Sequence, residues 1–298
     1  MGRWLAPVIG VLLLAACAGT TSTAASSIDV VAGENFWGSL VTQLGGAKVR
    51  VQSVVTDPNA DPHEYESSTN DARAFAEARL VILNGAGYDD WGQKLLDANK
   101  ASSREVIKVA ELVGKKEGDN PHFWYNPAYV TQVADKITST LKSIDAADAG
   151  YFDQQRSQLT IAFRPYLEAV ANINQKYSGV PIGATESIFA YMATALGLNL
   201  TTPPEFMNAV AEGNDPPAAS VAQFQDQIVK KQARVLVYNR QTSTAVTTNL
   251  KVLAAQAGIP TVGVTETIQP PDATFQQWFG AELDQLQNAL NVNALSGR

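Results

Sequence analysis

Short apolar segments with strand character alternate with helical segments in two parts of this chain, and the stretch between them has no strand signal. Candidate strands occur within residues 28–109 and again within residues 180–264. Alternation of this kind is typical of parallel α/β sheets. Residues 127–177 instead show helical spacing of their apolar side chains. The chain therefore predicts an α/β fold of two lobes, each a mostly parallel sheet flanked by helices, joined by a long interlobe helix.

The predicted domain boundaries lie where this alternation stops and resumes. The N-terminal lobe is expected at residues 28–143, the linking helix at 144–177 and the C-terminal lobe at 178–298. Pro165 lies in the linking segment and is expected to bend or interrupt its helix, because proline lacks a backbone donor. The segment 202–217 contains four prolines, which predicts an irregular loop there.

The N-terminus has the features of an export signal. Arg3 precedes an apolar run at residues 7–16, which is too short to cross a bilayer as a mature helix. The run ends in the letters LAAC at 14–17, and Cys17 is the chain's single cysteine. This order resembles a bacterial lipobox, in which the chain is cut before the cysteine and lipid is attached to its thiol. The alternatives are an ordinary signal peptide with a chance cysteine and a buried apolar segment.

These features predict where the protein is located. Residues 1–17 are expected to be a lipoprotein signal peptide, and residues 18–27, rich in serine, threonine and alanine, a flexible tether. The folded body would then be exported and lipid-anchored to the outer face of the cytoplasmic membrane. A net charge of -7 and a pI near 4.9 argue against a nucleic-acid partner, which would need a basic face. We expect the protein to be a monomer.

The chain contains only two histidines, and each follows a proline. His63 lies in the segment DPHEYE at 61–66, and His122 lies in PHFWYN at 121–126. Proline fixes its own φ and biases the preceding residue away from helix, so both imidazoles are expected on loops. Imidazole is the commonest metal ligand in proteins. The two histidines therefore predict one metal site that folding assembles.

Two glutamates follow candidate strands of the second half, Glu186 after 180–184 and Glu266 after 261–264. Parallel α/β sheets bind ligands beyond the carboxyl ends of their strands. The candidate ligands of a first-row divalent ion between the lobes are His63, His122, Glu186 and Glu266. Two alternatives remain open, since Glu186 could only cap the helix after its strand and Glu266 could be a solvated loop acid.

Four segments carry a family resemblance in their sequence and order: DPHEYE at 61–66, PHFWYN at 121–126, ATESIFAY at 184–191 and VTETI at 264–268. From about residue 28 to its C-terminus, the chain resembles the zinc/manganese solute-binding lipoproteins of bacterial ABC importers, receptors with a rigid interlobe helix. The resemblance implies that His63 and His122 are metal ligands, with Glu186 as the third. It implies Glu266 as the fourth, where the family usually has an aspartate, so this position departs from the family pattern.

The resemblance also implies a function. The protein would not be an enzyme, but would capture Mn²⁺ or Zn²⁺ as cargo and deliver it to an ABC-type permease in the membrane. Two carboxylate ligands slightly favour manganese as the cargo, although most such sites bind zinc more tightly in vitro. Asn239 and Arg240 are further candidates near the site. The alternatives are a receptor for an organic or chelated-iron ligand on the same scaffold, and a metal-dependent hydrolase, for which the sequence lacks the HExxH motif and a nucleophile elbow.

Overall fold

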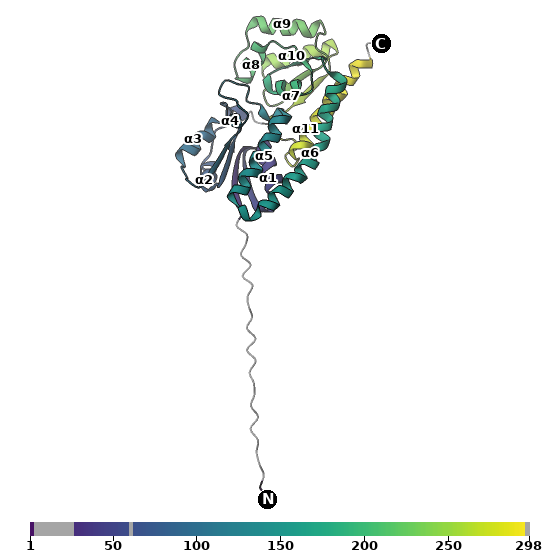
Figure 1. Ribbon diagram of the computed structural model, residues 1–298. Coiled ribbons are helices and arrows are strands. Elements are labelled where there is room, and N and C mark those ends of the chain that lie inside the picture. The colour runs from purple at the N-terminus through teal and green to yellow at the C-terminus, as the bar shows by residue number, and fades with distance from the viewer. Residues whose placement is uncertain (3–26, 60–61, 296–298) are drawn as a thin grey trace.

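The computed structural model describes residues 1–2, 27–59 and 62–295. It shows two α/β lobes joined by a long helix, which confirms the predicted fold class (Figure 1). The predicted signal peptide and tether, Cys17 included, lie almost wholly outside the described residues. Within the described part of the chain, no helix is both long and apolar enough to cross a membrane.

The N-terminal lobe is built on a parallel sheet of four strands in the order β2-β1-β3-β4. Its strands are β1 (Ile28–Glu34), β2 (Val49–Val55), β3 (Leu80–Leu83) and β4 (Glu105–Lys108). All four residues of β3 are buried, as expected of a strand that is covered on both faces. Its helices are α1 (Asn35–Gly45), α2 (Thr69–Glu77), α3 (Asp90–Ala98), α4 (Val109–Leu112) and α5 (Pro127–Ile144).

The C-terminal lobe repeats this arrangement, with four parallel strands in the order β6-β5-β7-β8. Its strands are β5 (Pro181–Ala184), β6 (Asn199–Leu200), β7 (Leu236–Asn239) and β8 (Thr261–Val264). Its helices are α7 (Ala190–Ala195), α8 (Pro204–Ala211), α9 (Ala218–Val229), α10 (Ala245–Ala257) and α11 (Phe275–Leu295). β7 therefore lies between β5 and β8, the two strands that precede Glu186 and Glu266.

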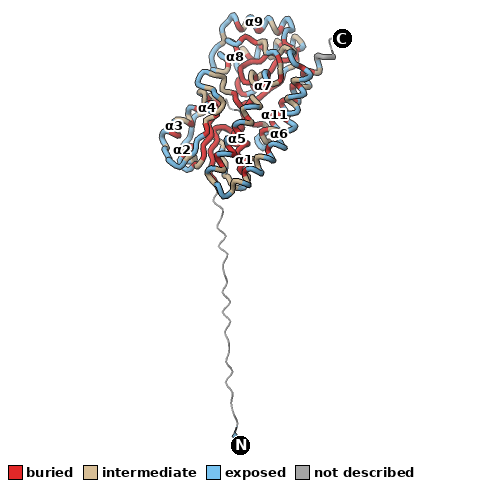
Figure 2. Tube along the Cα trace, viewed as in Figure 1, coloured by how far each residue is buried: buried red, intermediate tan, exposed pale blue. Residues whose placement is uncertain are grey.

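Helix α6 (Ala149–Tyr177) runs from one lobe to the other beside α11 (Figure 1). Phe163 and Tyr166 of α6 pack against the rings of Phe275 and Phe279 on α11. The main hydrophobic core is continuous from the N-terminal sheet through α5, α6 and α11 to the C-terminal sheet, and Figure 2 shows this buried interior. Because both lobes share one core, a wide hinge motion between them would expose apolar surface to water.

Two predictions made from prolines need correction. Pro165 was expected to bend or interrupt the linking helix, and it does not interrupt α6, which is one continuous helix of 29 residues. Pro165 is exposed, so water can hydrate the carbonyl that it leaves without a partner, while Phe163 and Tyr166 anchor the helix on its buried side. The segment 202–217 is not irregular throughout, because it contains α8, whose first residue is Pro204. Proline is favoured at the first helical position, where its missing N–H would have had no helical partner.

The His63 segment follows the strand β2, and the His122 segment follows the short helix α4. A short 3₁₀ turn, Pro62–Glu64, lies between β2 and α2, and a second one, Phe123–Tyr125, precedes α5. The side chain of Asn126 accepts hydrogen bonds from the first backbone N–H groups of α5, which fixes the exit of the second turn. His63 thus lies on a short turn and His122 immediately before one, and neither lies on an α-helix face, as predicted.

Candidate metal centre

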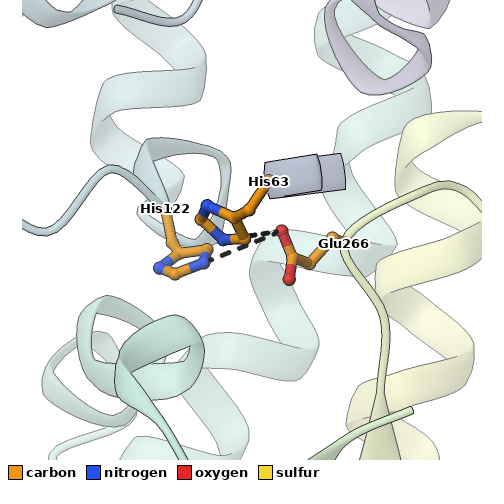
Figure 3. Close-up of side chains that lie close together, drawn as sticks. All are labelled: His63, His122 and Glu266. Atoms are coloured by element: carbon orange, nitrogen blue, oxygen red, sulfur yellow. Dashed lines mark ion pairs between the residues drawn. The ribbon is translucent and has the colours of Figure 1, made fainter. Parts of the chain in front are cut away.

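Three of the four predicted ligands converge between the lobes. His63 comes from the turn after β2, His122 immediately precedes the turn Phe123–Tyr125, and Glu266 lies just beyond β8. Figure 3 shows the two imidazoles of the N-terminal lobe facing the carboxylate of the C-terminal lobe. The side chains of His122 and Glu266 are completely buried, whereas 23% of the His63 side chain is exposed. Solvent therefore reaches the site from the side of His63.

The spacing of these atoms is close to that of a metal site. The Nε2 atom of His63 lies 3.4 Å from Oε2 of Glu266, and Nε2 of His122 lies 3.9 Å from the same oxygen. One ligand atom from each of the three residues lies within 4.8 Å of the others. A tetrahedral zinc ion with bonds of about 2.0–2.2 Å separates its ligand atoms by about 3.3–3.6 Å. The His63 atom already has that spacing, and the His122 atom is a few tenths of an ångström beyond it.

Asn120 sets the orientation of the His122 ring. Its Oδ1 lies 2.7 Å from Nδ1 of His122 and accepts a further hydrogen bond from the His122 backbone N–H at 3.1 Å. Its Nδ2 donates to the carbonyl of Ser187 in the other lobe, so Oδ1 must be the atom that faces the ring. Nδ1 of His122 is then the protonated nitrogen, and Nε2 carries the free lone pair that a metal ion needs.

The electrostatics of the site favour a cation. Burial, with the nearby His63 as a smaller cause, holds the pKa of His122 well below its usual range, so its imidazole is neutral. Its buried Nε2 has no hydrogen-bond partner among the described residues. The Oε2 atom of Glu266 faces the imidazoles of both His63 and His122. Two imidazole nitrogens and a carboxylate oxygen placed in this way are ligands that suit a divalent cation.

Tyr88 also reaches Glu266 from the N-terminal lobe. Its hydroxyl donates to Oε2 of Glu266 at 2.6 Å. The loop after β3 that carries Tyr88 has positive φ at Gly85, Ala86 and Gly87, and the Asp89 carboxylate closes it by accepting the Asn84 and Gly85 backbone N–H groups. The loop is thus held in a conformation that alanine rarely adopts, which fixes the position of the Tyr88 hydroxyl.

Glu186 lies next to this group but does not belong to it. Its Oε1 accepts a hydrogen bond from Nδ2 of Asn239 at 2.8 Å, and its Oε2 accepts one from the Thr242 hydroxyl at 2.7 Å. The same Nδ2 of Asn239 donates to Oε1 of Glu266 at 2.6 Å, so one amide joins the two carboxylates. Burial, and then the charge of Glu266, raise the pKa of Glu186 to about 8.

Arg240, the other residue predicted near the site, is exposed, and its Nε occupies the space in which a side chain at Gly263 would lie. The next residue, Gln241, makes the contacts near the site instead. Its Oε1 accepts hydrogen bonds from the backbone N–H groups of Glu266 and Thr267. The loops after β7 and β8 are therefore tied together directly behind Glu266.

Glu282 of α11 supports the same loop from the other side. Its Oε1 accepts hydrogen bonds from the Thr265 backbone N–H and the Trp278 indole, both at 3.0 Å. Its Oε2 accepts from the Tyr125 hydroxyl at 3.0 Å, and that hydroxyl also lies 2.8 Å from the Thr265 carbonyl. Tyr125 follows His122 by three residues, so Glu282 connects both ligand-bearing segments. Burial raises its pKa to about 8.

Sequence reasoning missed most of these supporting side chains: Tyr88, Asn120, Gln241, Thr242 and Glu282. Only Asn120 carries a local signal, since it stands two residues before His122 in the segment Asn-Pro-His. An asparagine at that distance can bond the histidine through its side chain, as it does here. The others reach the site from separate elements, and their contacts depend on how the strands are ordered.

Comparison with known proteins identifies the family of this chain. The sequence profile of the ZnuA family, described as zinc-uptake complex component A periplasmic, matches residues 30–289. The chain is 26% identical over 208 residues to the metal ABC transporter substrate-binding lipoprotein FimA of Streptococcus parasanguinis, covering 62% of this chain and 65% of FimA. It is 26% identical over 222 residues to the manganese ABC transporter substrate-binding lipoprotein PsaA of Streptococcus mitis, covering 66% and 69%. The chain thus spans about two thirds of the length of these relatives.

A solved structure of a Mn-bound variant of a periplasmic metal binding protein from Candidatus Liberibacter asiaticus has the same fold. It superposes with a TM-score of 0.74 at 15% identity, over 89% of this chain and 100% of that one. At this identity the likeness establishes the fold alone. The family match covers most of the chain and confirms the resemblance that its motifs showed. The chain therefore belongs to the ZnuA family of zinc-uptake complex components, which are substrate-binding transport proteins and not enzymes.

Proposed function

We propose that this protein is the extracytoplasmic receptor of an ABC importer, which captures one divalent transition-metal ion between its lobes and delivers it to a membrane permease. One observation carries the proposal. The buried Nε2 of His122 is neutral, lacks a hydrogen-bond partner among the described residues and faces the Glu266 carboxylate, which His63 also faces. Two imidazoles and a carboxylate that converge in this way suit a divalent cation.

The proposed ligands are His63, His122 and Glu266, with Glu186 as the fourth. The Asn239 amide donates to the carboxylates of both Glu186 and Glu266, so Glu186 lies beside the other three proposed ligands. Two imidazoles and two carboxylates suit Mn²⁺ and Zn²⁺. The names of the relatives support both ions, since PsaA is a manganese protein and the family is described by zinc uptake.

The proposed location rests on the N-terminal sequence and on the relatives. FimA and PsaA are both lipoproteins. We propose that cleavage before Cys17 and lipid attachment to its thiol anchor this chain in the same way, with residues 18–27 as the tether. The lipidated receptor would then act as a monomer at the outer face of the cytoplasmic membrane, close to its permease.

A metal titration tests the proposed function. The described helices and strands all lie between residues 28 and 295, so residues 28–298 can be purified without the lipid anchor and stripped of metal. Titration against a chelator should show one tight site per chain for Mn²⁺ and for Zn²⁺. Glu168→Gln, a change at an exposed acid of α6, should bind like the unaltered protein. Binding of neither ion would refute the metal site, and an organic ligand that copurifies without metal would point to the alternative receptor.

Asn120→Ala should weaken binding of both ions by about 10–100-fold, the usual cost of removing the partner that orients a histidine ligand. The His122 ring then loses the acceptor that keeps the proton on Nδ1. The measurement is the same chelator competition, with Asn208→Ala on the exposed side of α8 as the matched control. An unchanged affinity in Asn120→Ala would show that this bond does not set the ring.

A further inference from the structure

Glu186 is held at both of its carboxylate oxygens, and this distinguishes it from the three converging ligands. Asn239 donates to one oxygen at 2.8 Å, and Thr242 donates to the other at 2.7 Å. The glutamate and both donors are buried, with 1%, 2% and 8% of their surface exposed. Water therefore cannot readily replace either bond.

The orientation of the Asn239 amide follows from its other contact. Its Oδ1 accepts the Gln241 backbone N–H at 2.9 Å, so its Nδ2 must face the carboxylates. That nitrogen has two hydrogens and donates one to Glu186 and one to Glu266. The arrangement follows from the sheet order, because β7 delivers Asn239 between the ends of β5 and β8.

These bonds limit how Glu186 can bind an ion. A carboxylate oxygen has two lone pairs, so it can coordinate an ion and accept a hydrogen bond at once only where the donor lies on its other lone pair. Binding through one oxygen therefore constrains at most one of the two donors, whereas binding through both oxygens constrains both. Zn²⁺ is satisfied by four ligands in a tetrahedron. Mn²⁺ favours oxygen-rich sites with octahedral geometry, for which a carboxylate that binds through both oxygens supplies an additional ligand atom.

We propose that Thr242, together with Asn239, sets the metal preference of the site, by restricting Glu186 to one-oxygen binding and so disfavouring ions that need more than four ligands. This inference rests on the proposed function, because it concerns the fourth ligand of the same site. Thr242 is a positioning residue here, since it acts on the ion through Glu186. The predicted effect is a change in the ratio of the Mn²⁺ and Zn²⁺ affinities. A change that weakens both affinities equally leaves this ratio unaltered.

The test compares Thr242→Val, which keeps the side-chain shape but removes the hydroxyl, with Thr242→Ser, which keeps the hydroxyl. In chelator competition, Thr242→Val should raise the affinity for Mn²⁺ relative to Zn²⁺ by about tenfold, the lower end of the effects of residues that support metal ligands. Thr242→Ser should restore the ratio of the unaltered protein. The absorption spectrum of bound Co²⁺ gives an independent readout, since it should shift from a four-coordinate towards a higher-coordinate form only in Thr242→Val.

The possible outcomes separate this inference from the proposed function. If the unaltered protein binds both ions and Thr242→Val has the same affinity ratio and Co²⁺ spectrum, the inference is wrong while the receptor function stands. If the unaltered protein binds neither ion, the proposed function fails and this inference fails with it. Should Thr242→Val not fold, as judged by its circular dichroism, Thr242→Ala removes the same hydroxyl without adding bulk and is expected to shift the ratio in the same direction.

Discussion

His122→Ala is expected to abolish tight binding of both Mn²⁺ and Zn²⁺ while the protein remains folded. His122 contributes the Nε2 atom that lacks a partner in the buried site, and alanine has nothing to replace it. Loss of a residue that merely supports a ligand costs about 10–100-fold in affinity, so loss of the ligand itself should cost more than about 100-fold. Chelator competition with each ion measures the change.

Stability and affinity should respond differently to this substitution. In the metal-free protein the change removes a buried nitrogen without a hydrogen-bond partner, which partly offsets the packing and the Asn120 bond that are lost. Denaturant unfolding in the presence of a chelator should therefore show a folded, cooperative variant. His63→Ala should lose binding in the same way, because it removes the second imidazole of the group. Near-normal affinity in both variants would exclude this site as the place where the ion binds.

The metal-free protein is expected to become less stable as the pH rises from 5 to 8. Burial raises the pKa of Glu282 from 4.5 to about 8. Between these two values the folded protein holds a proton that the unfolded chain has lost, so raising the pH favours unfolding. One pKa unit corresponds to about 1.4 kcal/mol, so Glu282 alone should lower the free energy of unfolding by on the order of 4 kcal/mol across this range. Glu186, whose pKa is also raised to about 8, acts in the same direction.

Glu282→Gln isolates the part of this effect that belongs to one residue. Glutamine has the same shape, stays neutral at every pH and keeps an acceptor for the Thr265 backbone N–H and the Trp278 indole. Denaturant unfolding in a chelator should give similar stabilities for the variant and the unaltered protein at pH 5, and a more stable variant at pH 8. Parallel pH profiles for the two proteins would show that Glu282 is not the group that titrates.

The sequence predicted the parts of the fold and site that depend on local pattern. Alternating strands and helices predicted both parallel sheets, and the Pro-His segments predicted two imidazoles on turns. The prolines predicted an irregular loop at 202–217 and a bend or interruption at Pro165, whereas the structure has α8 within that segment and a continuous helix through Pro165. The effect of a proline depends on whether it begins a helix, as Pro204 does, or lies on an exposed face, as Pro165 does. The bonds to Glu186 come from residues 53 and 56 positions further along the chain. They follow from the position of β7 between β5 and β8, and no local pattern encodes strand order.

Helix α11 is the last element of the described chain, and Glu282 and Trp278 on it brace the loop that carries Glu266. If export starts at the proposed N-terminal signal peptide, His63 and His122 cross the membrane before this helix does. Until then the carboxylate half of the site has no support, and the shared core is incomplete. High-affinity capture would therefore require the whole chain up to α11, and a receptor that is still crossing the membrane would hold no ion tightly.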